Sequence, residues 1–463
     1  MTAGGDGRGL VGEREAEGTS PGPALLEPRG LVRPAPGVAT VRERLEPLRR
    51  FFLADPVQVP LAIFLLSRAY VFLLGALAMH IDAALPPVAA LGYYLPRLYG
   101  PTHYLLQPWR NWDGHWFALI AERGYAYDPF VSAFYPLYPL LLRGGARLLD
   151  GRVELAGVLI SNAAFLGALV VLYRLIQIDF PRPVALRALL YLALFPTSYY
   201  FSALYSESLF LLLSVACLYA ARRDRWWPAG VCGFLAALTR THGALLLLPL
   251  AILFLRQQGW RPWRWSWRAT PAPLALVPAG LMSYMAYLRY LWDDPLVMLR
   301  AQRGWDRYSA TPLETLREGW SQVDGCAVRD WGVGVDFCWA ERFRAHPNLA
   351  TIRDLNWRWA LSESDAVEFV ATLLLLAIVL IAFRLLPPAY SAYLAAGTIL
   401  PLWSPSIVHP LMSMHRFALI LFPAFIVLAL LGRWRPMHGA LIVVSALLLA
   451  FFTIQFASWL WVA

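Results

Sequence analysis

The 463-residue chain contains no lysine, and only 15% of its residues are charged. Because a soluble globular protein has about one quarter of its residues charged, this shortage excludes a soluble enzyme. The chain has only four cysteines, too few for a scaffold held together by disulfides. Hydrophobic residues make up 59% of the sequence, which excludes an intrinsically disordered protein. The composition therefore predicts a membrane protein with several transmembrane segments.

The positive charge of the chain comes entirely from arginine. All 40 basic residues are arginine, and the formal net charge is +10. These arginines lie between apolar segments, a placement typical of topology signals and of contacts with lipid headgroups. We therefore expect membrane lipids as partners and no nucleic acid.

The apolar segments predict an all-α polytopic fold. Residues 1–50 are rich in Gly, Pro, Glu and Arg, and we expect a disordered cytoplasmic tail there, with no signal peptide before residue 58. Residues 51–463 form the predicted membrane domain. Segments long enough to cross a bilayer lie at 58–79, 153–176, 184–203, 205–222, 227–257, 270–291, 366–383, 387–403, 416–432 and 437–461. Region 227–257 reads as two short helices broken near residues 239–243, so the count is about 11.

The distribution of arginine predicts the orientation. If the N-terminus is cytoplasmic, the short arginine-rich loops all fall on the cytoplasmic side, as the positive-inside rule requires. These loops lie near residues 182–187, 222–225, 261–268 and 433–435. Two long segments, 80–152 and 292–365, then lie outside the cytoplasm.

The outer segment 80–152 is rich in aromatic residues. Trp109, Trp112, Trp116 and Ile120 are spaced as on one face of a helix, which predicts a short helix in the membrane interface. The stretch 134–149 predicts a second interfacial helix.

The outer segment 292–365 mixes tryptophan with balanced charges, as a small folded cap would. It contains Cys326 and Cys338, and the sequence leaves open whether these two form a disulfide.

Four separate segments bring ionisable residues to the predicted outer surface: Asp113, Glu207, Arg240 with His242, and His409 with His415 and Arg416. An aspartate at a lipid–water boundary can remove a proton from an acceptor hydroxyl, and two guanidinium groups suit a phosphate. This set predicts group transfer from a lipid phosphate.

Simpler structural roles remain open for each of these residues. Asp113 and Glu207 could be helix caps, and Arg240 and Arg416 could anchor helix ends. Arg68, in the middle of a predicted span, needs a buried partner or a transport role. The histidines lack zinc-ligand spacing, so we propose no metal site.

At these residues the chain resembles the PIG-V-like mannosyltransferases, a family that includes the second mannosyltransferase of GPI-anchor synthesis and bacterial relatives. The motifs are NWDGHW at 111–116, IAERGY at 120–125, FYPLYP at 134–139, FPT at 195–197, YSES at 205–208, the pair Arg240 and Gly243, SMHRF at 413–417, and FP at 422–423. The resemblance extends over about residues 58–435.

The resemblance implies a glycosyltransferase of fold class C (GT-C) that uses a polyprenyl-phosphate sugar. It implies Asp113 as the catalytic base, Glu207 as a second carboxylate of the site, and Arg240 and Arg416 near the donor phosphate. We add the neighbouring Trp112, His115 and His415 as candidate substrate-binding residues. No cofactor is required by this scheme, and dependence on a divalent metal stays open.

The preferred hypothesis is transfer of mannose from polyprenyl-phosphate-mannose to an extracytoplasmic hydroxyl of a glycan or glycolipid, in a bacterial plasma membrane. One alternative is a transporter or flippase of lipid-linked saccharides, which Arg68 favours because transport needs polar groups within the bilayer. Another is the same enzyme class with a different sugar, such as glucose or arabinose.

Overall fold

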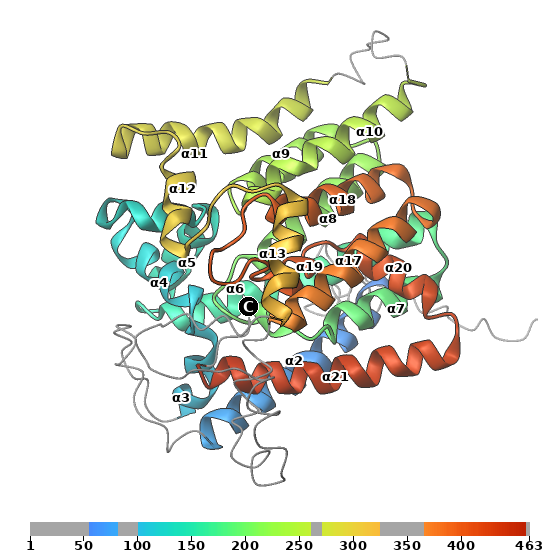
Figure 1. The fold of residues 1–463 in the computed structure, drawn as a ribbon, viewed down its shortest axis with the longest axis horizontal. Helices are drawn as coiled ribbons and strands as arrows, with labels where there is room; N and C mark the ends of the chain where they lie inside the picture. The colour runs from blue at the N-terminus through green and yellow to red at the C-terminus, as the bar shows by residue number, and fades with distance from the viewer. Residues whose placement is uncertain (1–54, 82–100, 261–270, 325–364, 460–463) are drawn as a thin grey trace, which may run out of the picture. The chain divides into compact units, whose positions relative to one another are not determined.

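The computed structural model describes residues 55–81, 101–260, 271–324 and 365–459. The predicted tail at 1–50 lies outside these residues, as do Cys326 and Cys338. Throughout the described ranges the regular secondary structure is helical (Figure 1).

Four described helices are long and apolar enough to cross a membrane: α2 (Asp55–Ile81), α6 (Val153–Asp179), α17 (Asp365–Leu385) and α21 (Arg435–Ala457). Their positions agree with four of the predicted segments. The protein is therefore a multi-pass membrane protein. The total of about 11 spans stays a prediction.

The remaining predicted segments form shorter helices. These are α7 (Arg182–Ala193), α8 (Glu207–Arg222), α9 (Trp226–Ala237), α10 (Leu247–Gln257), α11 (Leu276–Trp292), α18 (Pro388–Leu402) and α20 (Pro423–Leu431). The break expected within 227–257 is present, between α9 and the 3-10 helix η7 (Thr241–Leu246). The prediction of one continuous helix at 416–432 is wrong: α19 (Met414–Ala418) ends before Pro423, where α20 begins. Proline lacks the N–H needed inside a helix but fits its first turn.

Close helix packing depends on small residues. α6 packs along α8, α8 along α9, and α9 along α11. At the last of these interfaces, a Cβ on Gly280 of α11 would lie 2.4 Å from the carbonyl oxygen of Phe234 in α9. Glycine therefore sets how closely these two backbones approach, as is common between membrane helices.

The first predicted outer segment, from residue 101 on, contains short helices: α3 (Pro101–Leu106), η3 (Gln107–Arg110), α4 (Asp113–Arg123), η4 (Tyr125–Tyr127), η5 (Pro129–Ala133) and α5 (Leu137–Leu148). The helix predicted within 134–149 is present as α5. The prediction of one helix with Trp109, Trp112, Trp116 and Ile120 on a single face is wrong, because Trp109 lies in η3 and Trp112 interrupts the helix with a φ of 56°. The helix proper begins at Asp113.

The described part of the second outer segment contains α12 (Val297–Arg300), η9 (Ala301–Trp305) and α13 (Pro312–Asp324). Between η9 and α13 the chain runs beside the loop after α18. There, the N–H of Tyr308 donates to the carbonyl of Pro405 at 3.1 Å. This segment also contacts the first one, since the rings of Trp305 and Phe130 stack with centroids 4.0 Å apart.

Arg68 of α2 has a structural partner. Its guanidinium donates to the carbonyl of Ala193 at the end of α7, at 3.1 Å, and to the carbonyl of Ser198, at 2.8 Å. It also donates to the hydroxyls of Ser198 and Ser202 and lies over the ring of Phe165. The last carbonyls of a helix carry partial negative charge, so the end of α7 compensates the buried cation.

Candidate active site

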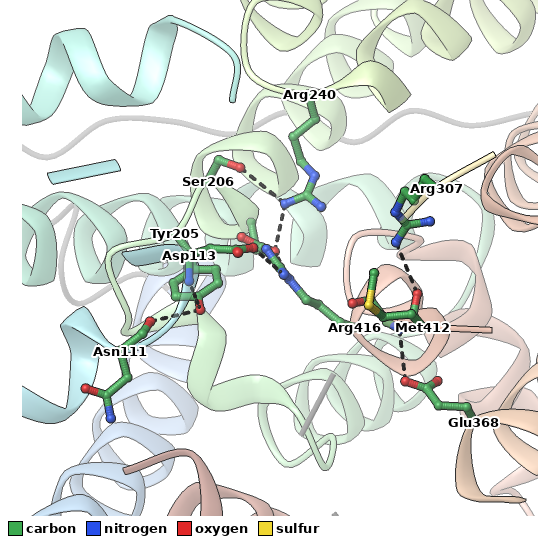
Figure 2. Close-up of polar contacts among 11 residues, drawn as sticks. Asn111, Asp113, Tyr205, Ser206, Arg240, Arg307, Glu368, Met412 and Arg416 are labelled. Carbon is green, nitrogen blue, oxygen red and sulfur yellow. Dashed lines mark hydrogen bonds and ion pairs between the residues drawn. The ribbon is translucent and has the colours of Figure 1, made fainter. Parts of the chain in front are cut away.

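Four of the predicted residues, Asp113, Glu207, Arg240 and Arg416, form one group of ion pairs, which we call the charged cluster. Arg416 Nη1 lies 2.7 Å from Asp113 Oδ2, and Arg416 Nε lies 2.6 Å from Glu207 Oε1. Arg240 Nη1 lies 2.7 Å from the same Glu207 oxygen. Figure 2 shows Arg240 and Arg416 approaching from different elements, with Asp113 beside Tyr205. The four residues come from α4, α8, the start of η7 and α19.

Asp113 is placed by the turn before α4. Asn111, in this turn, donates from its amide Nδ2 to the carbonyls of Phe456 and Ala457 at the end of α21. The N–H of Asp113 donates to the Tyr205 hydroxyl at 3.0 Å, and that hydroxyl donates to the carbonyl of Asn111. The side chain of Asp113 keeps 18% of its surface exposed. A carboxylate that is fixed yet accessible can reach a substrate.

Glu207 is the innermost member of the charged cluster. Its side chain is fully buried, and it is the first residue of α8. Glu207 does not act as a helix cap, because its Oε1 forms ion pairs with the guanidinium groups of Arg240 and Arg416. Glu207 therefore supplies the negative charge that holds two arginines side by side in a buried position.

Arg416 is enclosed on several sides. Besides its two carboxylate partners, the guanidinium lies over the rings of Tyr200 and Tyr205, with its Cζ 4.9 and 4.7 Å from their centroids. Its side chain is 9% exposed. These contacts fix the plane of the guanidinium, so Arg416 is not a helix anchor reaching toward lipid headgroups.

Arg240 occupies the break between α9 and η7. Its Nη1 contacts Glu207 and also lies 3.2 Å from the hydroxyl of Ser206. The side chain is 12% exposed, slightly more than that of Arg416. Because the break places Arg240 at the end of a helix, its side chain can turn inward to the charged cluster.

The other three predicted site residues lie around the charged cluster in different environments. The ring of Trp112 packs against Trp459, with centroids 5.6 Å apart. His115 lies on α4, where burial and, secondarily, the nearby positive charge of Arg110 lower its pKa to about 4. His415 stacks on Phe452, and its Nδ1 lies 2.8 Å from Glu368 Oε1.

Two charged residues beside the charged cluster were not predicted. Arg307 donates from Nη1 to the carbonyl of Ser404 at 2.6 Å and from Nη2 to that of Met412 (Figure 2). Burial and repulsion by Arg416 lower the pKa of Arg307 to about 10. Glu368, in the first turn of α17, accepts the N–H groups of Ser413 and His415. The sequence offered one signal for Glu368, since a carboxylate at the end of a predicted span needs a partner.

The arrangement suits proton removal beside an anion. Two carboxylates and two guanidinium groups balance in charge within the charged cluster, and Arg307 adds a cation next to it. Within the described ranges, no group of three or more histidine, cysteine or acidic residues could hold a metal ion.

The comparisons with known proteins agree with the motifs. Residues 62–254 match the family described as Mannosyltransferase (PIG-V), which confirms the resemblance over this range. The matched range includes Asp113, Glu207 and Arg240, whereas Arg416 lies beyond it.

Individual relatives give the same result. The chain is 29% identical over 257 residues to mouse GPI alpha-1,6-mannosyltransferase 2, covering 49% of this chain and 50% of the relative. It is 33% identical over 175 residues to the rat protein of the same name, covering 35% of each. The chain thus spans half or less of the length of these curated relatives. The crystal structure of an Archaeoglobus fulgidus oligosaccharyltransferase in the apo form aligns with 85% of this chain and 56% of its own, at 14% identity and a TM-score of 0.38, too low to establish a shared fold.

Proposed function

We propose that this relative of the PIG-V mannosyltransferases is itself a glycosyltransferase with a GT-C architecture. In this proposal it transfers mannose from polyprenyl-phosphate-mannose to a hydroxyl group of a glycan or glycolipid on the extracytoplasmic side of a bacterial plasma membrane. The observation that carries the proposal is the charged cluster, in which the partly exposed Asp113 is held by a buried arginine.

Asp113 is the general base of the proposed reaction. The acceptor oxygen attacks C1 of the mannose, and its proton passes to the Asp113 carboxylate. The bond between C1 and the phosphate oxygen breaks, and its electron pair stays on the polyprenyl phosphate. Since the leaving group is already a stabilised anion, no carboxylic acid is needed to protonate it, unlike in a glycosidase. A single displacement of this kind inverts the configuration at C1.

The arginines serve the phosphate and the base in different ways. Arg416 orients Asp113 through its 2.7 Å contact. Arg240 contacts Glu207 and Ser206 through Nη1, and we expect its other guanidinium nitrogens to bind the donor phosphate. Glu207 keeps both arginines in place and has no proton-transfer role. Trp112, His115 and His415 stay candidates for contacts with the substrates.

The transport alternative loses its main support. Arg68 was the charged residue whose place within a span favoured a polar path across the bilayer. Its guanidinium is hydrogen-bonded to backbone carbonyls at and just after the end of α7. The charged cluster, in contrast, is built from helix ends and breaks. A flippase would move lipid-linked sugar between leaflets without forming a new glycosidic bond.

The test is transfer of radiolabelled mannose from polyprenyl-phosphate-mannose by purified protein in vesicles, supplied with glycan and glycolipid acceptors. Asp113→Asn is expected to lower kcat by about 10²- to 10⁴-fold, the usual contribution of a general base. Asp128→Asn is the matched control, because Asp128 lies in the same outer segment and accepts only a backbone N–H in its side-chain contact with Phe130.

Near wild-type activity of Asp113→Asn would remove Asp113 as the base. Movement of lipid-linked sugar between leaflets without any transfer would overturn the enzyme assignment. A panel of polyprenyl-phosphate sugars, including glucose and arabinose, tests the identity of the sugar.

A further inference from the structure

The two residues that immediately precede Asp113 and α19 have an unusual backbone. Trp112, directly before Asp113, has a φ of 56°, and Ser413, directly before α19, has a φ of 72°. Residues other than glycine rarely adopt a positive φ, and a residue as large as tryptophan does so only where its surroundings hold it there. The two partners of the Asp113–Arg416 ion pair therefore each follow a strained turn.

The Tyr205 side chain bridges the two ends of the first turn. The hydroxyl of Tyr205 accepts the N–H of Asp113 and donates to the carbonyl of Asn111, each at 3.0 Å, so it joins the residues on both sides of Trp112. Tyr205 is 1% exposed. Because it lies two residues before Glu207, the same stretch of chain fixes the turn and the centre of the charged cluster.

A carboxylate binds two backbone N–H groups of the second turn. Glu368 accepts the N–H of Ser413 at 2.9 Å and the N–H of His415 at 3.3 Å, one through each oxygen. Glu368 belongs to the first turn of α17, more than forty residues earlier in the chain. Arg416 lies one residue after the second of these contacts, so Glu368 fixes the backbone from which Arg416 reaches Asp113.

We propose that Tyr205 and Glu368 are positioning residues, which hold the two strained turns so that Asp113 and Arg416 meet. Neither residue needs to touch a substrate for this role. The activity that they support rests on the proposed function, whereas the two turns themselves can be tested without it.

The kinetic test compares Tyr205→Phe and Glu368→Gln with two matched controls. Tyr284→Phe removes another buried hydroxyl, which donates to the backbone carbonyls of Ser132 and Phe134. Glu314→Gln removes another carboxylate that accepts a backbone N–H, that of Thr311 before α13.

Tyr205→Phe and Glu368→Gln are each expected to lower kcat about 10- to 100-fold with little change in the KM for the donor, because a small displacement of a reacting group costs this much. The controls are expected to keep kcat within about twofold, since they leave both turns intact. Equal losses of kcat in variants and controls would overturn the proposal.

Hydrogen–deuterium exchange gives a readout that does not depend on activity. We expect faster exchange in peptides covering residues 111–116 in Tyr205→Phe, and in peptides covering 413–418 in Glu368→Gln. Unchanged exchange in these peptides would overturn the proposal, whether or not the wild-type protein transfers sugar. Failure of the proposed function alone would instead appear as a wild-type protein without transfer activity but with the expected changes in exchange.

A rescue variant guards against simple misfolding. Ser413→Gly removes the cost of the positive φ while keeping the backbone N–H. The double variant Ser413→Gly with Glu368→Gln is therefore expected to have a kcat about tenfold higher than that of Glu368→Gln alone, because the cost of the strained turn is removed. No recovery in a correctly folded double variant would count against the strained turn as the element that Glu368 holds.

Discussion

Replacing Glu207 by glutamine should destabilise the protein strongly although the two side chains have nearly the same size. Glu207 is fully buried, and one of its oxygens lies 2.6 Å from Arg416 Nε and 2.7 Å from Arg240 Nη1. After the substitution, Arg416 still contacts the carboxylate of Asp113, whereas Arg240 loses the carboxylate that it contacts. Removing one partner of a buried ion pair costs about 3–5 kcal/mol, because the remaining charge is left uncompensated.

The structure places the expected cost near the lower end of this range. Arg416 keeps its contact with Asp113, and Arg240 keeps the hydroxyl of Ser206 and 12% of its surface exposed. We therefore expect Glu207→Gln to lower the free energy of unfolding by about 3 kcal/mol. Equilibrium unfolding in mixed micelles of mild detergent and sodium dodecyl sulfate measures it.

Two further variants make this prediction specific. Asp179→Asn breaks an ion pair with Arg222 whose side chains are about 20% exposed, and it should cost no more than about 1 kcal/mol. The double variant Glu207→Gln with Arg240→Gln also removes the cation that Glu207→Gln leaves without a carboxylate, so its cost should be smaller than the sum of the two single costs by about 1–3 kcal/mol. Additive costs, or a Glu207→Gln protein within about 1 kcal/mol of wild type, would refute the reasoning.

Two other predictions concern the surroundings of the charged cluster. Gly243→Ala should destabilise the protein by about 3 kcal/mol or more, because the added Cβ would lie 2.3 Å from the backbone of Ala236. Gly144→Ala in α5 is the control and should be tolerated, because its Cβ would meet no atom within 4 Å. Thermal unfolding of the two variants measures the difference. The pKa of His115 is about 4 in the folded protein, below the usual value near 6.5. Between these two pH values the unfolded chain therefore binds a proton that the folded protein does not. The free energy of unfolding consequently falls as the pH drops from about 6.5 to 4. His115→Gln should therefore lose less stability than wild type between pH 7.5 and pH 5, and an equal loss in both proteins would exclude His115 as a source of the acid sensitivity.

The long helices could be predicted from the sequence because their signal is local. An apolar run such as that of α2 or α6 needs no knowledge of its neighbours, and the break near Arg240 follows from a cluster of polar residues within an apolar region. The lengths of the shorter elements could not be predicted as well. Proline and tertiary contacts end them, as at Pro423, where an apolar run by itself would continue.

The gathering of ionisable residues could be predicted, but their pairing could not. Alternation of the spans predicts that Asp113, Glu207 and Arg416 lie at the same surface, yet it does not say that one arginine bridges both carboxylates over separations of 209 and 303 residues. The positive φ of Trp112 could not be predicted from the sequence either, since no neighbouring residue in the chain favours it. Such a conformation follows only from contacts such as that of Tyr205.

Arg68 has a consequence for the order in which the chain is assembled. It lies near the middle of α2, the first described spanning helix, and an arginine at the centre of a membrane helix opposes insertion by about 2.5–3.5 kcal/mol. Apart from the adjacent hydroxyl of Ser67, the carbonyls and hydroxyls that accept its hydrogen bonds are 125 to 134 residues further along the chain. Because these acceptors are synthesised after α2, the hydrogen bonds that compensate the charge of Arg68 can form only once the chain has reached the end of α7 and Ser202.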